Sequence, residues 1–152
     1  MSESHDIIQV TAAILVMQRR VLIARRRPGG HQANRWEFPG GKVEPGESPP
    51  ECLQRELREE FDIEVQVGEY LGSHRHRYDF GVIELMAYRT EWCTGRIILR
   101  DHGAVRWAAA DELADYDFAP ADAPFVERIR SGEIPLFFQS GLRRRQPRYR
   151  NP

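Results

Sequence analysis

The sequence predicts an α+β fold in which a mixed β-sheet lies between helices, as an α/β/α sandwich. Segments typical of strands and of helices follow one another in the order strands, helix, strands, helix, which favours this class. The chain has 152 residues, a length that fits one domain with a core of its own. Its 41% hydrophobic and 30% charged residues are ordinary for a soluble globular protein.

The first third of the chain is predicted to form three strands joined by loops. Residues 6–17 contain the unbroken apolar run 12–17 and are expected to form a buried strand. A polar turn separates this strand from a second one at residues 21–26, and a short strand is expected at residues 35–38. Glycine and proline residues on both sides of the short strand mark it as lying between two loops.

Ser48 predicts the start of a helix that ends at Phe61. Serine can cap a helix, the two prolines that follow are tolerated in the first turn, and Glu51 completes a capping box. Apolar residues recur every four positions and predict the buried stripe of this helix, at Leu53, Leu57 and Phe61.

The second half of the chain is predicted to begin with strands and end with helices. The expected elements are strands near 63–78 and 82–92, a strand ending at Trp107, a short helix starting at Asp111, and a last helix at 122–130 that is closed by Gly132. We place one domain at residues 1–131 and a C-terminal arm with a basic end at residues 132–152.

Positive and negative charges nearly cancel over the whole chain, but they are segregated along it. The formal net charge is −1, whereas residues 132–152 carry five Arg against one Glu. Lys42 is the only lysine among 22 basic residues, and it follows directly on a pair of glycines. Bulk charge therefore does not predict a polyanion-binding protein, and Lys42 stands out as a candidate site residue.

Several protein classes are not expected. The longest apolar run, residues 12–17, is far shorter than the roughly 20 residues of a membrane span. The N-terminus lacks the basic region of a secretory signal. Cys52 and Cys93 stand alone, without the spacing of a disulfide framework or a zinc site, so we expect a protein of the reducing cytoplasm.

The predicted helix carries three carboxylates on one face. Glu56, Glu59 and Glu60 are related by steps of three and four residues, which brings them within about 100° of one another around the helix axis. Their mutual repulsion would be relieved by a hard divalent cation such as Mg²⁺ or Mn²⁺. The alternative is a solvated acidic face, but the adjacent Gly40 and Gly41, where backbone can approach a ligand closely, favour a site.

The same region resembles the Nudix box of nucleoside-diphosphate-linked hydrolases. The matching pattern is Gly41, five residues, Glu47, seven residues, Arg55-Glu56-Leu57-Arg58-Glu59-Glu60, one residue, Asp62 and Ile63. Asp62 is the one fixed position that differs, since the family usually has Gly there. Asp tolerates the left-handed conformation expected at this helix end at modest cost, so we expect no loss of activity.

The resemblance extends beyond the box to about residues 7–131. Residues 24–42 and 117–122 resemble the MutT branch, which hydrolyses nucleoside triphosphates. It implies that Glu56 and Glu59 act in catalysis and that Glu47 holds Arg55 through a salt bridge. The implied metal ligands are Gly40 through its carbonyl, Glu56, Glu59, Glu60 and Asp101. The implied substrate contacts are Arg26, Glu37, Lys42 and Asp122.

Alternatives remain open for three of these residues. Asp101 is equally consistent with a turn before His102, and Arg26 belongs to a run of three arginines of the kind that is often solvated. Asp122 matches the position of an Asn that reads 8-oxoguanine in the MutT branch. An ionised Asp only accepts hydrogen bonds, which suits the N4 amine of cytosine, whereas a protonated Asp regains a donor. Asp122 could instead only cap the last helix.

The reaction implied by the resemblance is attack of water on the β-phosphorus of a nucleoside triphosphate, which gives a nucleoside monophosphate and pyrophosphate. Such an enzyme would remove damaged nucleotides from the pool and so support DNA repair. The alternatives are hydrolysis of dinucleoside polyphosphates or other nucleoside diphosphates, and a non-catalytic nucleotide- or RNA-binding module. We expect a monomer or homodimer without membrane contact, and a solvated basic tail rather than one that binds nucleic acid.

Overall fold

The computed structural model describes residues 6–30, 32–100 and 102–137 of the chain. Its elements are β1 (Ile7–Met17), β2 (Arg20–Arg26), β3 (Trp36–Glu37), α1 (Pro49–Phe61), β4 (Ile63–Tyr78), β5 (Gly81–Gly95), β6 (His102–Ala108), the 3₁₀ helix η1 (Ala110–Asp115) and α2 (Ala123–Arg130). The predicted order of strands and helices is confirmed, and strand bounds differ from the prediction by a few residues. No helix in the described ranges is long and apolar enough to cross a membrane.

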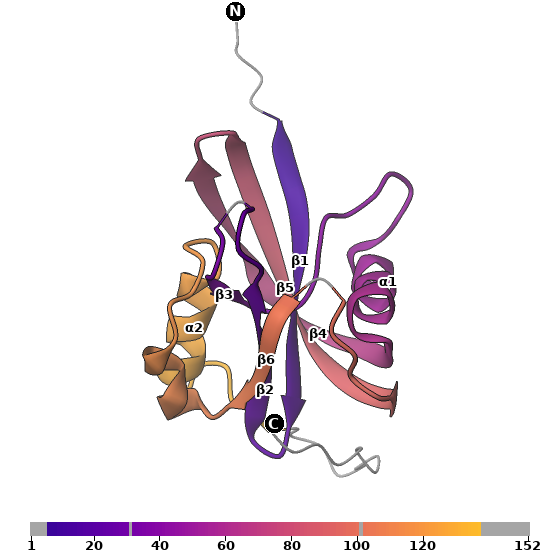
Figure 1. Cartoon of the computed structure of the whole chain (residues 1–152), viewed down its shortest axis with the longest axis vertical. Helices are drawn as coiled ribbons and strands as arrows, with labels where there is room; N and C mark the ends of the chain where they lie inside the picture. The colour runs from indigo at the N-terminus through magenta and orange to yellow at the C-terminus, as the bar shows by residue number, and fades with distance from the viewer. Residues whose placement is uncertain (1–5, 31, 101, 138–152) are drawn as a thin grey trace, which may run out of the picture.

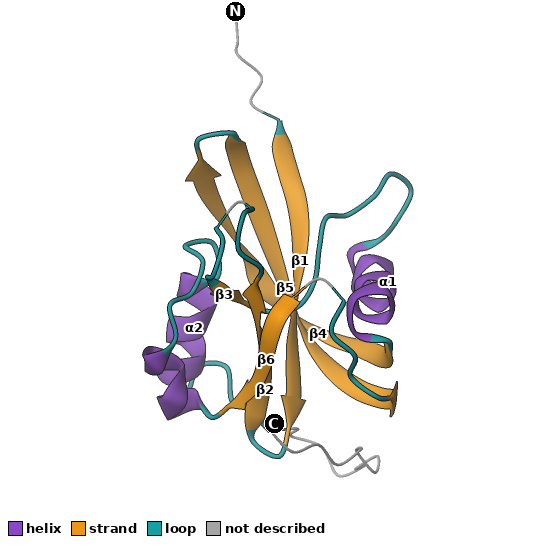
Figure 2. Ribbon diagram, viewed as in Figure 1, coloured by secondary structure: helices purple, strands orange, loops and turns teal. Residues whose placement is uncertain are grey.

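The strands form a mixed sheet in the order β3-β2-β1-β5-β4, and β6 pairs with β2 off this path. β1 runs parallel to β5 along residues 7–15, and the other named strand pairs are antiparallel. Figures 1 and 2 show α1 and α2 on opposite sides of the strands. The predicted α/β/α sandwich around a mixed sheet is therefore confirmed.

From Thr11 to Met17, β1 is buried on both faces and separates two hydrophobic cores. Alternate side chains of its apolar run join each core: Ala12, Ile14 and Val16 on the side of α2, and Ala13, Leu15 and Met17 on the side of α1. Because both faces are covered, the strand has a continuous apolar run instead of an alternating pattern. Leu53, Leu57 and Phe61 fix α1 against its core, and full burial of each contributes about 2 kcal/mol.

The ends of α1 have the caps that the sequence predicts. The Ser48 side chain accepts a hydrogen bond from the Glu51 amide, and the Glu51 side chain accepts one from the Ser48 amide. Asp62 ends the helix in the left-handed conformation, with φ of 60° and ψ of 36°. Its amide donates to the Arg58 carbonyl, so the usual glycine is replaced here without loss of the helix end.

The region around Asp101 and the C-terminal arm are described only in part. His102, which follows the turn considered for Asp101, is the first residue of β6. Asp101 and the basic stretch at 143–150 lie outside the described residues. In the part of the arm that is described, Ile134 and Leu136 are buried in the core beside α2.

Candidate active site

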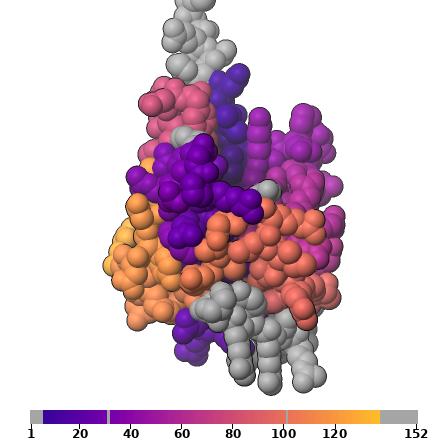
Figure 3. Space-filling view, in the orientation of Figure 1, coloured from indigo at the N-terminus to yellow at the C-terminus, as the bar shows by residue number. Residues whose placement is uncertain are grey.

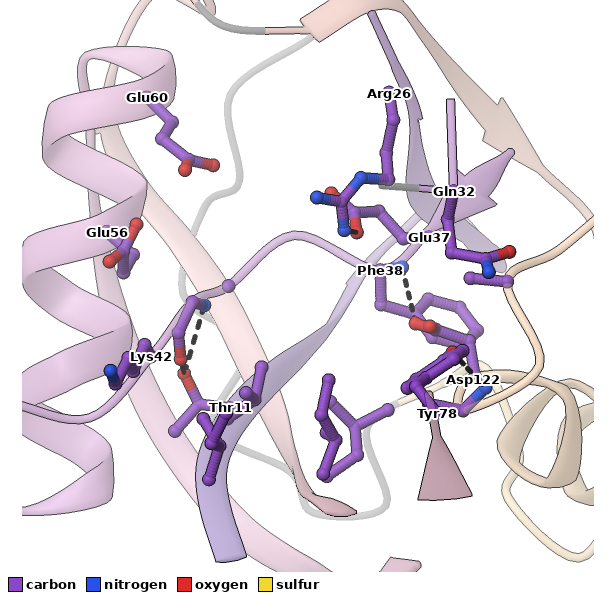
Figure 4. A pocket seen from close by; sticks show the side chains of 18 of the residues that line it. Thr11, Arg26, Gln32, Glu37, Phe38, Lys42, Glu56, Glu60, Tyr78 and Asp122 are labelled. Carbon is purple, nitrogen blue, oxygen red and sulfur yellow. Dashed lines mark hydrogen bonds and ion pairs between the residues drawn. The ribbon is translucent and has the colours of Figure 1, made fainter. Parts of the chain in front are cut away.

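A cavity of about 400 Å³ lies between α1 and the chain segment that leads into α2. Glu56 and Glu60 of α1 lie at one end, and Asp122 and Tyr78 lie at the other (Figure 4). The segment between β2 and β3, purple in Figure 3, forms the middle of the visible face, with α1 on one side and the α2 region on the other. The cavity thus joins an acidic helix to a buried carboxylate, and we call these the acidic end and the buried end.

The three helix carboxylates do not share one environment. The side chains of Glu56 and Glu60 are 13% and 19% exposed and line the cavity. The side chain of Glu59 is 60% exposed and is not among the residues that line it. The structure therefore brings two of the three predicted helix ligands into the cavity and leaves the third at its solvent side.

Arg55 is the counter-charge that holds this acidic region together. Its Nε donates to Glu47 Oε2 at 2.6 Å, and its Nη1 donates to Glu56 Oε1 at 3.0 Å and to Glu59 Oε2 at 3.2 Å. Its Nη2 also donates to the Lys42 carbonyl at 3.1 Å, which ties the glycine-rich loop to α1. Hydrogen bonds from Arg55 are the main reason that the pKa of Glu47 falls to about 2.

The glycine-rich loop lies along β1 and brings its backbone against α1. The Gly41 carbonyl accepts from the Thr11 amide at 2.8 Å and from the Thr11 hydroxyl at 3.1 Å. A Cβ on Gly40 would overlap the Thr11 carbonyl, and a Cβ on Gly41 would overlap the Glu56 carboxylate. Both glycines are therefore required by close approach, because no side chain fits between the loop and its neighbours.

The acidic end fits a hard divalent cation. It presents carboxylate and backbone oxygens, the donors that Mg²⁺ and Mn²⁺ prefer. The Gly41 backbone lies so close to the Glu56 carboxylate that a single methyl group on Gly41 would fill the space between them. We call this arrangement of loop backbone and carboxylate the cradle. No group of three His, Cys, Asp or Glu that could hold a metal occurs within the described ranges. Glu56 and Glu60 supply two carboxylates in the cavity lining, and Mg²⁺ commonly uses one or two carboxylates and completes its shell with substrate phosphates and water.

The buried end of the cavity is built around Asp122, which is only 5% exposed. Its Oδ1 accepts a hydrogen bond from the Phe38 amide at 3.1 Å. Burial raises the pKa of Asp122 well above its ordinary value of 3.8, and the nearby Glu37 carboxylate adds to this rise. Asp122 is the N-cap residue of α2, but its side chain makes no capping bond and accepts from the Phe38 amide instead, so its carboxylate does more than cap the helix.

β3 places Asp122 beside Phe38, although 84 positions separate the two in sequence. The Trp36 amide donates to the Asp117 carbonyl at 2.9 Å, and the Ala119 amide donates to the Trp36 carbonyl at 2.8 Å. The Ala121 amide donates to the Tyr78 hydroxyl at 3.0 Å. These bonds hold the segment before α2 against β3 and β4, so the buried carboxylate has a fixed position.

The middle of the cavity carries the other predicted substrate contacts. Arg26 Nη1 and Glu37 Oε1 form an ion pair at 3.2 Å, and both side chains line the cavity (Figure 4). Lys42 lines the cavity on the side of α1, and its backbone forms an isolated β-bridge with Val10 of β1. Of the three consecutive arginines at 25–27, Arg26 is the one that lines this cavity.

Sequence reasoning did not single out Thr11 or His102. Thr11 lies in an apolar strand, and only its contact with the loop reveals that it supports Gly41. His102 is buried, and its Nε2 lies 2.8 Å from Glu37 Oε2. Thr11 could have been noticed as a polar residue beside an apolar run. No sequence pattern indicates the role of His102, because its partners are distant in sequence.

The NUDIX domain family matches residues 7–129 of the chain. The CTP pyrophosphohydrolase of Escherichia coli K12 is 42% identical over 120 residues, which cover 79% of this chain and 89% of that protein. The 8-oxo-dGTP diphosphatase of Haemophilus influenzae is 32% identical, covering 81% of this chain and 91% of that protein. The chain belongs to the Nudix family and is a Nudix hydrolase of MutT type.

A solved structure supports the same assignment. The solution structure of the Escherichia coli ORF135 protein is 38% identical in sequence and superposes with a TM-score of 0.75. The match covers 88% of this chain and 96% of that one. Nudix hydrolases generally use divalent metal ions, which agrees with the oxygen-rich acidic end of the cavity.

Proposed function

We propose that this enzyme hydrolyses nucleoside triphosphates to nucleoside monophosphates and pyrophosphate, with Mg²⁺ or Mn²⁺ as cofactor. The observation that carries the proposal is the single cavity, which joins the carboxylates of α1 to the buried Asp122. A nucleotide has the same two-part chemistry, with phosphates at one end and a base with hydrogen-bonding edges at the other. The names of the two relatives, one acting on CTP and one on 8-oxo-dGTP, support this substrate class.

Glu56, Glu60 and the Gly40 carbonyl would hold the metal, with Glu59 and Asp101 as further ligands. When bound, the metal neutralises phosphate charge and lowers the pKa of a bound water. The polyphosphate is itself anionic, so an acidic end suits it only because the cation changes the sign of the local charge. Lys42 and Arg26 lie along the cavity where they would contact phosphate or sugar oxygens.

Glu56 is the residue that we assign to proton abstraction from the attacking water. Its side chain is mostly buried, it accepts a hydrogen bond from Arg55, and the Gly41 backbone leaves no room for a side chain beside it, so its direction is fixed. The water oxygen bonds to the β-phosphorus, and the bond between that phosphorus and the α,β-bridging oxygen breaks. The monophosphate leaves with the bridging oxygen, and the proton lost by water passes to Glu56.

The two protonation states of Asp122 serve two kinds of base. Its Oδ1 is taken by the Phe38 amide, so Oδ2 is the atom left to face a base. When ionised, Oδ2 accepts from an exocyclic amine such as N4 of cytosine. When protonated, a state that burial favours, it donates to a carbonyl such as O6 of 8-oxoguanine. We therefore expect activity on both CTP and 8-oxo-dGTP.

A panel of nucleotides with Mg²⁺, scored separately for pyrophosphate and orthophosphate, tests this function. We expect pyrophosphate from CTP, dCTP and 8-oxo-dGTP, and little hydrolysis of dinucleoside polyphosphates. Orthophosphate as the main product, or a preference for dinucleoside polyphosphates, would replace the proposed reaction by another of the same family. No turnover of any nucleotide by pure protein would identify a binding module and exclude the proposal.

A further inference from the structure

His102 connects Glu37, in the middle of the cavity wall, with Glu60 at the acidic end, through contacts that the reaction above does not use. The side chain is 6% exposed, and its ring stacks on Phe61 of α1 with a centroid distance of 5.1 Å and an interplanar angle of 15°. Its Nε2 lies 2.8 Å from Glu37 Oε2, and its Nδ1 lies 3.8 Å from Glu60 Oε2. A single imidazole ring therefore stands between a substrate-contact carboxylate and a carboxylate of the acidic end.

The backbone explains how this ring comes to lie between Glu37 and Glu60. His102 pairs with Arg26 across β6 and β2, next to an irregularity in register between Arg25 and Arg26. Such irregularities commonly redirect side chains near active sites. Arg26 in turn forms the ion pair with Glu37, so a continuous series of contacts runs from Arg26 through Glu37 and His102 to Glu60.

The chemistry of the contacts fixes the ring. An ionised carboxylate only accepts hydrogen bonds, so the short contact with Glu37 requires the proton on Nε2. Phe61 holds the plane of the ring, and Glu37 holds its rotation. Nδ1 then faces Glu60 at a distance longer than a hydrogen bond and has no hydrogen-bond partner within the described part of the chain.

We propose that His102 is a positioning residue that sets the direction of the Glu60 carboxylate and couples it to the Arg26–Glu37 pair. This inference rests on the proposed metal-dependent function. Glu60 Oε2 lies beside the His102 ring, and the Glu60 carboxylate lines the cavity where a metal would be held (Figure 4). Hydrogen-bonded partners behind metal-binding side chains commonly change metal affinity 10- to 100-fold when removed, and the longer contact here predicts the lower end of that range.

The variant His102→Gln tests the role in the full-length protein. Glutamine can still donate to Glu37 but places no ring against Phe61 and no ring nitrogen beside Glu60. We expect Mn²⁺ binding, measured by calorimetry without nucleotide, to weaken about tenfold. We also expect the lost hydrolysis to be largely regained at high Mn²⁺ concentration, which a merely structural defect would not show.

His74→Gln is the matched control, because it makes the same chemical change on β4 at a residue that does not line the cavity. We expect this control to bind Mn²⁺ as the unaltered protein does. Equal Mn²⁺ affinity of His102→Gln and His74→Gln overturns the positioning role while leaving the proposed function intact. An unaltered protein that binds no Mn²⁺ and hydrolyses no nucleotide overturns both.

A measurement on the unaltered protein keeps the proposal testable if His102→Gln does not fold. Addition of Mg²⁺ should shift the ring nitrogen resonances of His102 in nitrogen-15 NMR spectra and leave those of His74 nearly unchanged. Ring resonances of His102 that move no more than those of His74 would contradict the coupling of this ring to Glu60.

Discussion

The acidic end and the buried end of the cavity use the same functional group in opposite surroundings. Beside the acidic end, the Arg55 guanidinium contacts four carboxylates, and its hydrogen bonds are the main reason that the pKa of Glu47 falls to about 2. At the buried end, Asp122 is withdrawn from water and its pKa rises. The surroundings, and not the residue type, therefore decide whether a carboxyl group here keeps its charge, as Glu47 does, or favours its protonated form, as Asp122 does.

This contrast separates two tasks. Changes at the acidic end should alter the rate on every nucleotide to the same extent, because phosphates and metal are common to all of them. Changes at Asp122 should alter the preference among bases, because the base is what differs.

The largest effect is expected for Glu56→Gln. Loss of the group that takes the proton from water should lower kcat about 10³-fold on CTP and on 8-oxo-dGTP alike, the range typical of general base catalysis. Steady-state kinetics on both substrates measures it. Glu64→Gln is the matched control: Glu64 is exposed and pairs with Arg58, away from the cavity. A tenfold change in the preference between substrates in Glu56→Gln would break the separation of tasks.

A smaller loss is expected for Gly41→Ala. The added methyl group overlaps the Glu56 carboxylate, so the loop or the carboxylate must shift. A displacement of about 1 Å at a reacting group can cost about 10²-fold in rate, and we expect a loss of this order on all substrates. Gly30→Ala is the control, since a Cβ there meets no atom within 4 Å. Equal kcat values for the two variants would show that the cradle is not needed.

The stability of the protein should report the burial of Asp122. Because its pKa is raised in the folded state, the folded protein binds the proton more tightly than the unfolded chain does. The stabilisation is complete below the ordinary pKa of 3.8 and is lost as pH rises through the folded-state pKa. The amide side chain of the Asp122→Asn variant cannot titrate, so the unaltered protein should lose stability relative to this variant with rising pH. Denaturant unfolding of both proteins across this range checks the sign, and a constant difference would contradict it.

Much of the fold followed from local signals in the sequence. The continuous apolar run at 12–17, the capping box at Ser48 and the repeat of Leu53, Leu57 and Phe61 each depend on near neighbours, and the structure has all three features. The left-handed conformation of Asp62 was also predictable, because only a few residue types end a helix in this way. The match to the Nudix box then defined the family.

The parts of the site that escaped prediction depend on contacts between distant residues. The raised pKa of Asp122 requires the segment before α2 to be packed against β3 and β4. No local sequence pattern predicts this packing. Glu59 is exposed whereas Glu56 and Glu60 are mostly buried, and this difference depends on the rotation of α1 about its own axis as it packs on its core. His102 gains its place from pairing with Arg26 and from Phe61, which lies on another element.

The most direct test of the separate tasks is the ratio of kcat/KM for CTP to kcat/KM for 8-oxo-dGTP in Asp122→Asn. The Phe38 amide would hold the amide oxygen of the new side chain, which leaves its NH₂ group to face the base. That group donates to O6 of 8-oxoguanine but cannot accept from N4 of cytosine. We predict that the ratio falls about tenfold, the value of one good base contact. An unchanged ratio would show that Asp122 does not read the base and would contradict the account.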